Sequence, residues 1–279
     1  MTKLILPSIP REEGITREGF QRSYLKSLQP VIIKDLSASW PAMKKWSPEY
    51  LKEKYGEKRV KVYNANFAKQ GKSYMSNVDV IPFKEFIDLV SQRSMDLRMF
   101  LYNLKTQMPE LVEDIQIPSI ASGFSRNLIF MFFGCKGSFT PMHFDIDMAH
   151  VFHTPIYGKK RVTLFPIEES KNLYKHPFTC RSYVDVDNPD FKKFPRLKNA
   201  QGYQDTLQPG ETLFIPGGYW HHIAYNESGC SVSLRCPHQS LSARLQGYIN
   251  LGVLMPVDRI MNRLFPESWF RWKENQSFN

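Results

Sequence analysis

Long apolar runs are missing from this chain. No stretch approaches the ~20 consecutive apolar residues that a helix needs to cross a bilayer. The first residues carry an apolar patch too short for a signal peptide, and neither an internal repeat nor a low-complexity tract is present. Because 42% of the residues are hydrophobic, a folded chain with a large core is expected rather than a disordered one. We therefore expect a single domain over residues 1–279 and no membrane partner.

Cysteine is also scarce, and no pair has the Cys-x-x-Cys spacing of a metal or redox motif. The four cysteines are Cys135, Cys180, Cys230 and Cys236. We interpret them as reduced thiols of a cytoplasmic protein, with a disulfide framework as the alternative.

Acidic residues are too few to balance the basic ones. The chain has 37 Lys and Arg against 27 Asp and Glu, which gives a net charge of +10. Such a balance favours acidic partners such as nucleic acid or an acidic peptide. The basic residues are widely spread, however, so we favour a solvated basic surface over a dedicated nucleic-acid stripe.

Helical and β patterns are unevenly distributed. Residues 1–97 mix the two, with Thr16 and Ser47 as expected helix N-caps. From residue 98 to 238, short apolar stretches bounded by Gly and Pro predict an antiparallel barrel or double-sheet roll, in which residues 144–152 are one strand. Within it, residues 166–208 form an insertion where a substrate-facing loop is expected. Residues 239–279 turn helical, with two helices expected on either side of Pro256.

The tripeptide His143-Phe-Asp145 points most directly to chemistry. On a strand, side chains two residues apart point to the same side, so His143 and Asp145 can reach one metal ion. His221 follows 76 residues after Asp145, and a hairpin predicted over residues 209–222 would place it at a strand start. Two histidines and one carboxylate form the facial set that holds non-haem Fe(II). His222 is the rival third ligand, because neighbours on a strand face opposite ways.

Several blocks of the sequence, spread over most of its length, are similar to one known family. The blocks are Gln29-Pro30-Val31-Ile32-Ile33, Ser39-Trp40-Pro41-Ala42, Asp185-Val186-Asp187-Asn188-Pro189-Asp190-Phe191, Thr140-x-x-His143-x-Asp145 and Trp220-His221-His222-Ile223. They resemble the JmjC/cupin-like (cupin 8) oxygenases, and most of all the asparaginyl hydroxylase that inhibits hypoxia-inducible factor. The resemblance implies a mainly β fold of the jelly-roll type, a double-stranded β-helix. N-terminal α/β elements over residues 1–97 and C-terminal helices over residues 239–279 would flank the core.

The resemblance also implies the site residues. Fe(II) would be held by His143, Asp145 and His221, with 2-oxoglutarate as co-substrate and dioxygen as the oxidant. A lysine side chain and two hydroxyl groups would bind the carboxylate of 2-oxoglutarate that lies away from the metal. These residues are Lys160 (with Lys159 as the alternative), Thr140 and Tyr102, although a plain core tyrosine is nearly as good an interpretation of Tyr102.

The chain departs from that relative on the substrate side. Ala149 and Arg235 stand where the relative has asparagines, so asparagine hydroxylation cannot be carried over. Arg235 would bind a carboxylate of the co-substrate or an acidic substrate group, or else form a structural ion pair. His150 and His153 fall in a segment with two extra residues. A second metal site is one interpretation of them, and a bulge with histidines behind the site or exposed is the favoured one.

The expected activity is hydroxylation of a C–H bond, first of a protein or peptide side chain. The alternatives are a transfer-RNA base, a small molecule of a biosynthetic pathway, and a cupin-like binding protein without turnover; N-methyl-lysine demethylation is a further one. By resemblance, the C-terminal helices would form a homodimer, and packing on the protein's own barrel is the alternative. The apolar residues concerned are Leu245, Ile249, Leu251, Leu254, Ile260 and Leu264.

Overall fold

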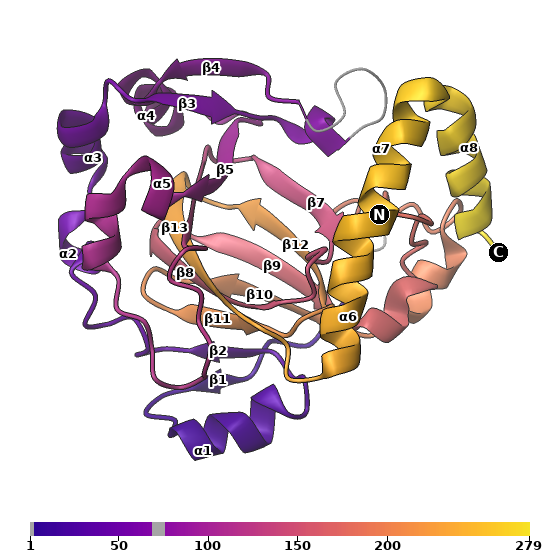
Figure 1. The fold of residues 1–279 in the computed structure, drawn as a ribbon, viewed down its shortest axis with the longest axis horizontal. Helices are drawn as coiled ribbons and strands as arrows, with labels where there is room; N and C mark the ends of the chain where they lie inside the picture. The colour runs from indigo at the N-terminus through magenta and orange to yellow at the C-terminus, as the bar shows by residue number, and fades with distance from the viewer. Residues whose placement is uncertain (1–2, 69–75) are drawn as a thin grey trace.

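Two sheets that face each other form the centre of the molecule (Figure 1). The computed structural model describes residues 3–68 and 76–279. The larger sheet has seven strands in the order β1 (Arg11–Glu12), β2 (Val31–Ile33), β11 (Thr212–Ile215), β8 (His150–Tyr157), β13 (Gly229–Cys236), β6 (Phe130–Gly134) and β5 (Arg98–Asn103). The smaller sheet has four in the order β10 (Tyr203–Leu207), β9 (Lys160–Phe165), β12 (Trp220–Tyr225) and β7 (Phe139–His143). Apart from the β1–β2 pair, neighbouring strands are antiparallel, which confirms the predicted mainly β, jelly-roll fold.

The seven-stranded sheet is covered on its outer face by elements from the first third of the chain. Phe20 packs against Phe152 and Phe214 with ring centroids 5.7 and 5.0 Å apart, and Phe86 packs against Phe133 at 5.6 Å. Large aromatic side chains bury much apolar area, which explains why β8 and β13 are buried almost throughout. The helical segments of this region are α1 (Arg17–Phe20), η1 (Gln21–Leu25), α2 (Ala42–Lys45), α3 (Pro48–Tyr55), η2 (Ala65–Ala68), α4 (Phe83–Gln92), α5 (Leu104–Gln107) and η3 (Pro109–Asp114).

Local capping chemistry sets the starts of two of these helices, as the sequence predicts. The side chain of Thr16 accepts a hydrogen bond from the backbone N–H of Gly19, and that of Ser47 accepts one from Tyr50. A two-stranded sheet, β3 (Arg59–Val62) with β4 (Asp79–Pro82), lies beside α4 at one end of the molecule (Figure 1).

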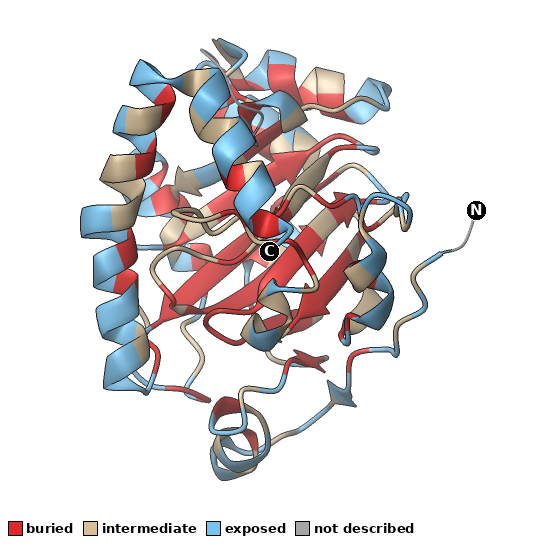
Figure 2. Ribbon diagram, turned by 90° about the vertical axis from the view of Figure 1, so that its right-hand side faces the viewer, coloured by how far each residue is buried: buried red, intermediate tan, exposed pale blue. Residues whose placement is uncertain are grey.

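The C-terminal region is helical, but its division differs from the prediction. Instead of a break at Pro256, the chain stays helical through α6 (Leu241–Ile249), the π-type turn η6 (Asn250–Leu254) and α7 (Met255–Leu264). A wider turn next to a proline is a common way to accommodate its missing N–H. A further helix that the sequence did not predict, α8 (Pro266–Ser277), folds back beside α7 (Figure 1). Figure 2 shows exposed residues along these helices over the buried strands.

Two strand predictions near the site are wrong. The strand expected over residues 144–152 begins only at His150, because β7 ends at His143 and a turn separates the two strands. The hairpin expected over residues 209–222 does not form, since β11 and β12 belong to different sheets and the Gly-rich turn between them crosses from one to the other. The insertion over residues 166–208 contains η4 (Ile167–Ser170) and η5 (Pro195–Asn199), and its end forms β10.

All four cysteines are free, so the disulfide alternative is wrong. Within the described residues, no helix is both long and apolar enough to span a membrane.

Candidate metal centre

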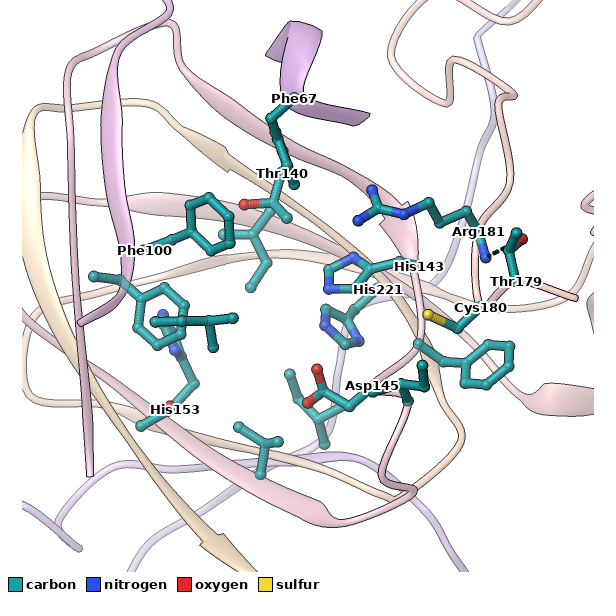
Figure 3. A pocket seen from close by; sticks show the side chains of 18 of the residues that line it. Phe67, Phe100, Thr140, His143, Asp145, His153, Thr179, Cys180, Arg181 and His221 are labelled. Carbon is teal, nitrogen blue, oxygen red and sulfur yellow. Dashed lines mark hydrogen bonds between the residues drawn. The ribbon is translucent and has the colours of Figure 1, made fainter. Parts of the chain in front are cut away.

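A cavity of about 210 Å³ lies between the two sheets. Its wall includes side chains from β5, β6, β8, β11 and β13 of the larger sheet and from β7, β9 and β12 of the smaller one. The α7 helix and the segment 178–181 of the insertion contribute further lining residues. Most residues predicted for the site therefore meet in one space, which Figure 3 shows from close by.

His143, Asp145 and His221 converge on one side of this cavity (Figure 3). One ligand atom from each lies within 4.8 Å of those of the other two, which is the spacing of a metal site. His143 ends β7 and His221 is the second residue of β12, and the two are direct partners in the ladder between these strands. Asp145 follows β7 in a turn. The predicted ligand set is thus brought together, although one member is not on a strand.

Both histidines are held with the same ring nitrogen available. Nδ1 of His143 lies 2.8 Å from the carbonyl oxygen of Pro141, and Nδ1 of His221 lies 3.0 Å from that of Tyr219. A carbonyl oxygen can only accept, so each Nδ1 carries the proton and donates it. The lone pair of each Nε2 is therefore left to bind a metal, as in most metal-binding histidines.

Burial and charge keep the ligands in the protonation states that metal binding requires. Burial, with a smaller contribution from His221, lowers the pKa of His143 to about 3. Burial alone would raise the pKa of Asp145, but Arg235 and the two histidines outweigh it and hold that pKa below its ordinary value. A neutral imidazole and an ionised carboxylate are the forms that coordinate a cation. The donor set therefore fits a divalent transition metal of the Fe(II) type.

His222 does not belong to this cluster. Its ring packs against Phe139 with centroids 5.6 Å apart, and its Nε2 lies 3.9 Å from Asp187. Neighbouring residues on a strand point to opposite faces, so His222 faces the insertion while His221 faces the cavity. The choice of His221 over His222 agrees with this geometry.

Lys160 is buried at the start of β9 and lines the same cavity. Its Nζ donates to Ser231 Oγ, lies 3.2 Å from His153 Nε2 and sits 4.2 Å from the ring centre of Tyr225. Among the described residues none offers it a carboxylate within ion-pair distance. Burial lowers the pKa of Lys160 to about 7. A buried ammonium group with only neutral neighbours is typical of a site for an anionic ligand.

The remaining predicted residues fall in different places. Thr140 of β7 lines the cavity (Figure 3), whereas Lys159, the alternative to Lys160, is exposed and pairs with Glu227 at 3.0 Å. Tyr102 is not among the lining residues. It packs against the core of the protein, and burial raises its pKa to about 12. The structure therefore does not bring Tyr102 to the cavity, in line with the core interpretation of this residue.

Arg235 of β13 lines the cavity and forms ion pairs. Its Nη2 donates to Asp145 Oδ2 at 2.9 Å, and its Nη1 donates to both carboxylate oxygens of Asp147 at 3.0 and 2.9 Å. The structural ion pair is the interpretation that the geometry supports, with the added feature that one partner is a candidate metal ligand.

His150 and His153 do not form a second metal site. Gly217 donates its backbone N–H to His150 Nδ1 at 2.8 Å, so His150 Nε2 carries the proton and donates to Gln239 Oε1 at 2.6 Å. Both nitrogens of His150 are thereby used in structural hydrogen bonds. His153 is buried beside Lys160, across the cavity from the triad in Figure 3, and burial lowers its pKa well below the ordinary value. Neither residue is exposed.

Several lining residues were missed from the sequence. Phe178, Cys180 and Arg181 come from the insertion, and Arg181 is paired with His143 in an isolated β-bridge. Phe67 also lines the cavity, and the guanidinium carbon of Arg181 lies 5.2 Å from its ring centre. For Phe178, Cys180 and Arg181 the one signal in the sequence was the expectation that the insertion faces the substrate, which does not single out positions. Phe67 lies outside the insertion, and no signal in the sequence pointed to it.

Comparison with known proteins agrees with this site. Residues 17–240 match the family described as the cupin-like domain. The chain belongs to this family. Among cupin-like relatives, tRNA wybutosine-synthesizing protein 5 of Gallus gallus is 28% identical over 254 residues, which cover 82% of this chain and 77% of that protein.

Two further cupin-like relatives are longer than this chain. Lysine-specific demethylase 8 of Xenopus tropicalis is 30% identical over 82% of this chain and 54% of its own length. JmjC domain-containing protein D of Dictyostelium discoideum is 33% identical over 73% of this chain and 50% of its own. The chain thus spans about half the length of these two proteins. These relatives support membership of the JmjC/cupin family. They do not test the particular likeness to the asparaginyl hydroxylase, which stays a prediction.

Proposed function

We propose that this protein is an Fe(II)- and 2-oxoglutarate-dependent dioxygenase that hydroxylates a C–H bond. The observation that carries the proposal is the convergence of His143, Asp145 and His221 within 4.8 Å, with both histidine Nε2 atoms left available by carbonyl-bound Nδ1 protons. A cupin-like binding protein without turnover would not require this ligand set.

The chain's own residues would bind and orient the reactants. The triad would hold Fe(II), which supplies the redox chemistry that couples decarboxylation of 2-oxoglutarate to hydroxylation by dioxygen. Lys160 would pair with the carboxylate of 2-oxoglutarate that lies away from the metal, because a charge-assisted hydrogen bond in a buried site is strong. The hydroxyl of Thr140 would add a second contact. Enclosure between two sheets would exclude water from the reaction.

Our first candidate for the substrate is an uncharged side chain of a protein or peptide. The described residues that line the cavity carry four positive charges and two negative ones, which are Lys160, Arg181, Arg235, Arg259, Asp145 and Asp258. Both acids are in ion pairs, Asp145 with Arg235 and Asp258 with Lys273. Asp147 offsets Arg235, and the bound co-substrate would offset Lys160, so the remaining lining charges are close to balanced. This balance suits an uncharged side chain better than the lysine named for one group of relatives.

RNA is the second candidate, and one observation favours it. The cavity wall combines the aromatic rings of Phe67, Phe100 and Phe178 with the guanidinium groups of Arg181 and Arg259. Aromatic faces stack on unpaired bases and arginines contact phosphates, so this combination suits a nucleotide. The similarity to a tRNA wybutosine-synthesizing protein over 77% of its length points the same way.

The proposal is tested by turnover. Purified protein supplied with Fe(II), ascorbate and 2-oxoglutarate is expected to release succinate, and His143→Ala or Asp145→Ala to abolish the release. Wild-type protein that releases no more succinate than these variants would overturn the enzyme assignment.

Mass spectrometry of protein and RNA from cells with and without the gene then identifies the substrate as the molecule that loses one oxygen on deletion. Salt-sensitive RNA binding would select the second candidate.

We also propose that the protein forms a homodimer through α6 and α7. Leu245, Ile260 and Leu264 are 58%, 57% and 61% exposed, so they do not pack on the protein's own barrel. Apolar side chains gathered on one helical region favour burial against a second copy.

Light scattering of wild-type protein is expected to give a dimer, and the double variant Leu245→Glu/Ile260→Glu a monomer. Ile5→Glu, at a residue that is 93% exposed and far from these helices in sequence, is the control; a monomeric wild type would contradict the proposal.

A further inference from the structure

The carboxylate of Asp145 is carried by a turn, so strand geometry does not fix its direction. β7 ends at His143, and Met148 in the following turn adopts a φ of 57°, in the left-handed region. The backbone N–H of Met148 donates to the carbonyl of Asp145 at 3.0 Å, which closes the turn locally. This local bond orders the backbone but not the Asp145 side chain. A contact from outside the turn is needed to hold that side chain toward the two histidines.

Arg235 provides this contact from the larger sheet. It is the second-last residue of β13, a strand that is buried along its length and paired on both sides, by β8 and β6. Nη2 donates to Oδ2 of Asp145 at 2.9 Å, so Oδ1 stays available to a metal ion. The planar guanidinium has a fixed fork of donors, so occupying one carboxylate oxygen also limits rotation of the carboxylate.

Asp147 fixes Arg235 in turn. Both of its oxygens accept from Nη1 of Arg235, and its Oδ1 also accepts from the backbone N–H of Ala149 at 3.2 Å. The C-terminal helical region adds a second anchor, because Asn250 donates to the carbonyl of Ile146 at 3.0 Å. The turn is thereby attached to two elements that are distant in sequence.

The charges give Asp147 a second role. A lone arginine beside a divalent cation would repel it, and this repulsion is strong where water is excluded. The carboxylate of Asp147 lies as close to Arg235 as that of Asp145 does, with both contacts at 2.9 Å. Asp147 therefore offsets the positive charge of Arg235 without occupying a coordination position. Arg235 can then direct Asp145 at little electrostatic cost to metal binding.

We propose that Arg235, with its charge balanced by Asp147, is the positioning residue for the metal ligand Asp145. The inference rests on the metal site of the proposed function, but not on 2-oxoglutarate or on any substrate. Two possible roles of Arg235 predict opposite changes in metal affinity when this residue is removed. If Arg235 acted only as a nearby positive charge, its removal would tighten metal binding. As a positioning residue, its removal weakens metal binding, because Asp145 loses its direction.

The test measures Mn(II) affinity by calorimetry in wild type, Arg235→Met, Arg235→Lys and Asp147→Asn. Arg235→Met is expected to raise the Kd about 10–100-fold, the cost of losing a residue that orients a ligand. Arg235→Lys keeps the charge but has no fork to bridge two carboxylates, so an intermediate loss is expected. Asp147→Asn is expected to lose less than Arg235→Met. The d–d absorption of bound Co(II), which reports ligand geometry, is expected to change in all three.

Arg161→Met is the matched control. Arg161 forms a comparable pair with Asp187 at 2.6 Å, but it does not line the cavity, so its loss should leave both readouts unchanged. Unchanged or tighter Mn(II) binding by Arg235→Met overturns the inference. If melting curves show that this variant is unfolded, unchanged binding by both Arg235→Lys and Asp147→Asn overturns it instead. Wild-type protein that binds Mn(II) no better than His143→Ala would refute the metal site itself, which is a separate outcome.

Discussion

His221 lies directly opposite His143 across the β12–β7 pair, and their ring centroids are 4.2 Å apart. The register of this ladder therefore decides which histidine reaches the cavity. A slip of one residue would turn every side chain of β12 to the other face, and His222 would replace His221. The β12–β7 ladder shifts register between His221 and Ile223, whereas the pairing of β12 with β9 on its other side keeps one register over six residue pairs and so holds the orientation of β12.

We expect His221→Ala and His222→Ala to differ in metal binding although they are neighbours. His221→Ala removes a ligand, so its loss of Mn(II) affinity should exceed the roughly 100-fold that a residue behind the ligands can cost. His222→Ala removes packing against Phe139 and should lower the melting temperature while Mn(II) binding persists. Calorimetry and thermal melting of the two variants check this. Equal metal affinity in both would contradict the assignment of His221.

The buried Lys160 predicts a pH dependence of 2-oxoglutarate binding. Its pKa is about 7 in the ligand-free protein because burial disfavours the charge, and an anionic ligand would favour the charged form. Raising the pH above 7 should therefore weaken binding, by up to about tenfold per pH unit. Lys160→Met should bind weakly and lose this slope. Lys159→Met, at the exposed neighbour, is the control and should keep both affinity and slope, and a slope that persists in Lys160→Met would refute the role.

Lys160 also predicts how the stability of the ligand-free protein changes with pH. Its pKa falls from an ordinary 10.5 to about 7 on folding, so between these values the unfolded chain binds more protons at this site. Stability contributed by this residue therefore rises as the pH rises from 7 to 10. We expect urea unfolding to show that the free energy of unfolding of the wild type, relative to that of Lys160→Met, increases between pH 7 and pH 10. A difference independent of pH would show that Lys160 is not buried as a titrating group.

Gly217 lies in the turn that precedes His221, and Gly252 lies in the C-terminal helical region. Substitution of each by alanine gives a test and a matched control. A Cβ on Gly217 would lie 2.1 Å from the carbonyl oxygen of Met148, which the backbone cannot tolerate. Gly217→Ala should therefore lower the free energy of unfolding by about 1–3 kcal/mol, the usual cost of overpacking. A Cβ on Gly252 meets nothing within 4 Å, and the residue is helical, so Gly252→Ala should be neutral or raise stability by up to about 1 kcal/mol. Urea unfolding distinguishes the two, and equal effects would contradict the close approach at Gly217.

Much of the site was present in the sequence because its members carry chemistry that few other residues supply. The pattern His143-x-Asp145 with a distant His221 predicts a metal, and Lys160 after a Gly turn stands at the start of its strand as expected. The helix caps at Thr16 and Ser47 were equally readable, since a cap depends on residues within one helical turn.

Other features could not be read from the sequence, because they depend on contacts between distant segments. Local alternation gives the two faces of β11 and β12, but it does not reveal that these strands lie in different sheets. The helix α8 and the lining by Arg181 follow from how the C-terminal region and the insertion pack onto the finished core.

The sequence by itself determined which side chains have the chemistry to bind a metal, namely His143, Asp145 and His221. Only the tertiary structure decided how Asp145 is directed. Its partner Arg235 comes from the other sheet, 90 positions further along the chain. The physical reason is that side-chain chemistry is local to each residue, whereas the direction of a carboxylate on a turn is fixed by whatever packs against it.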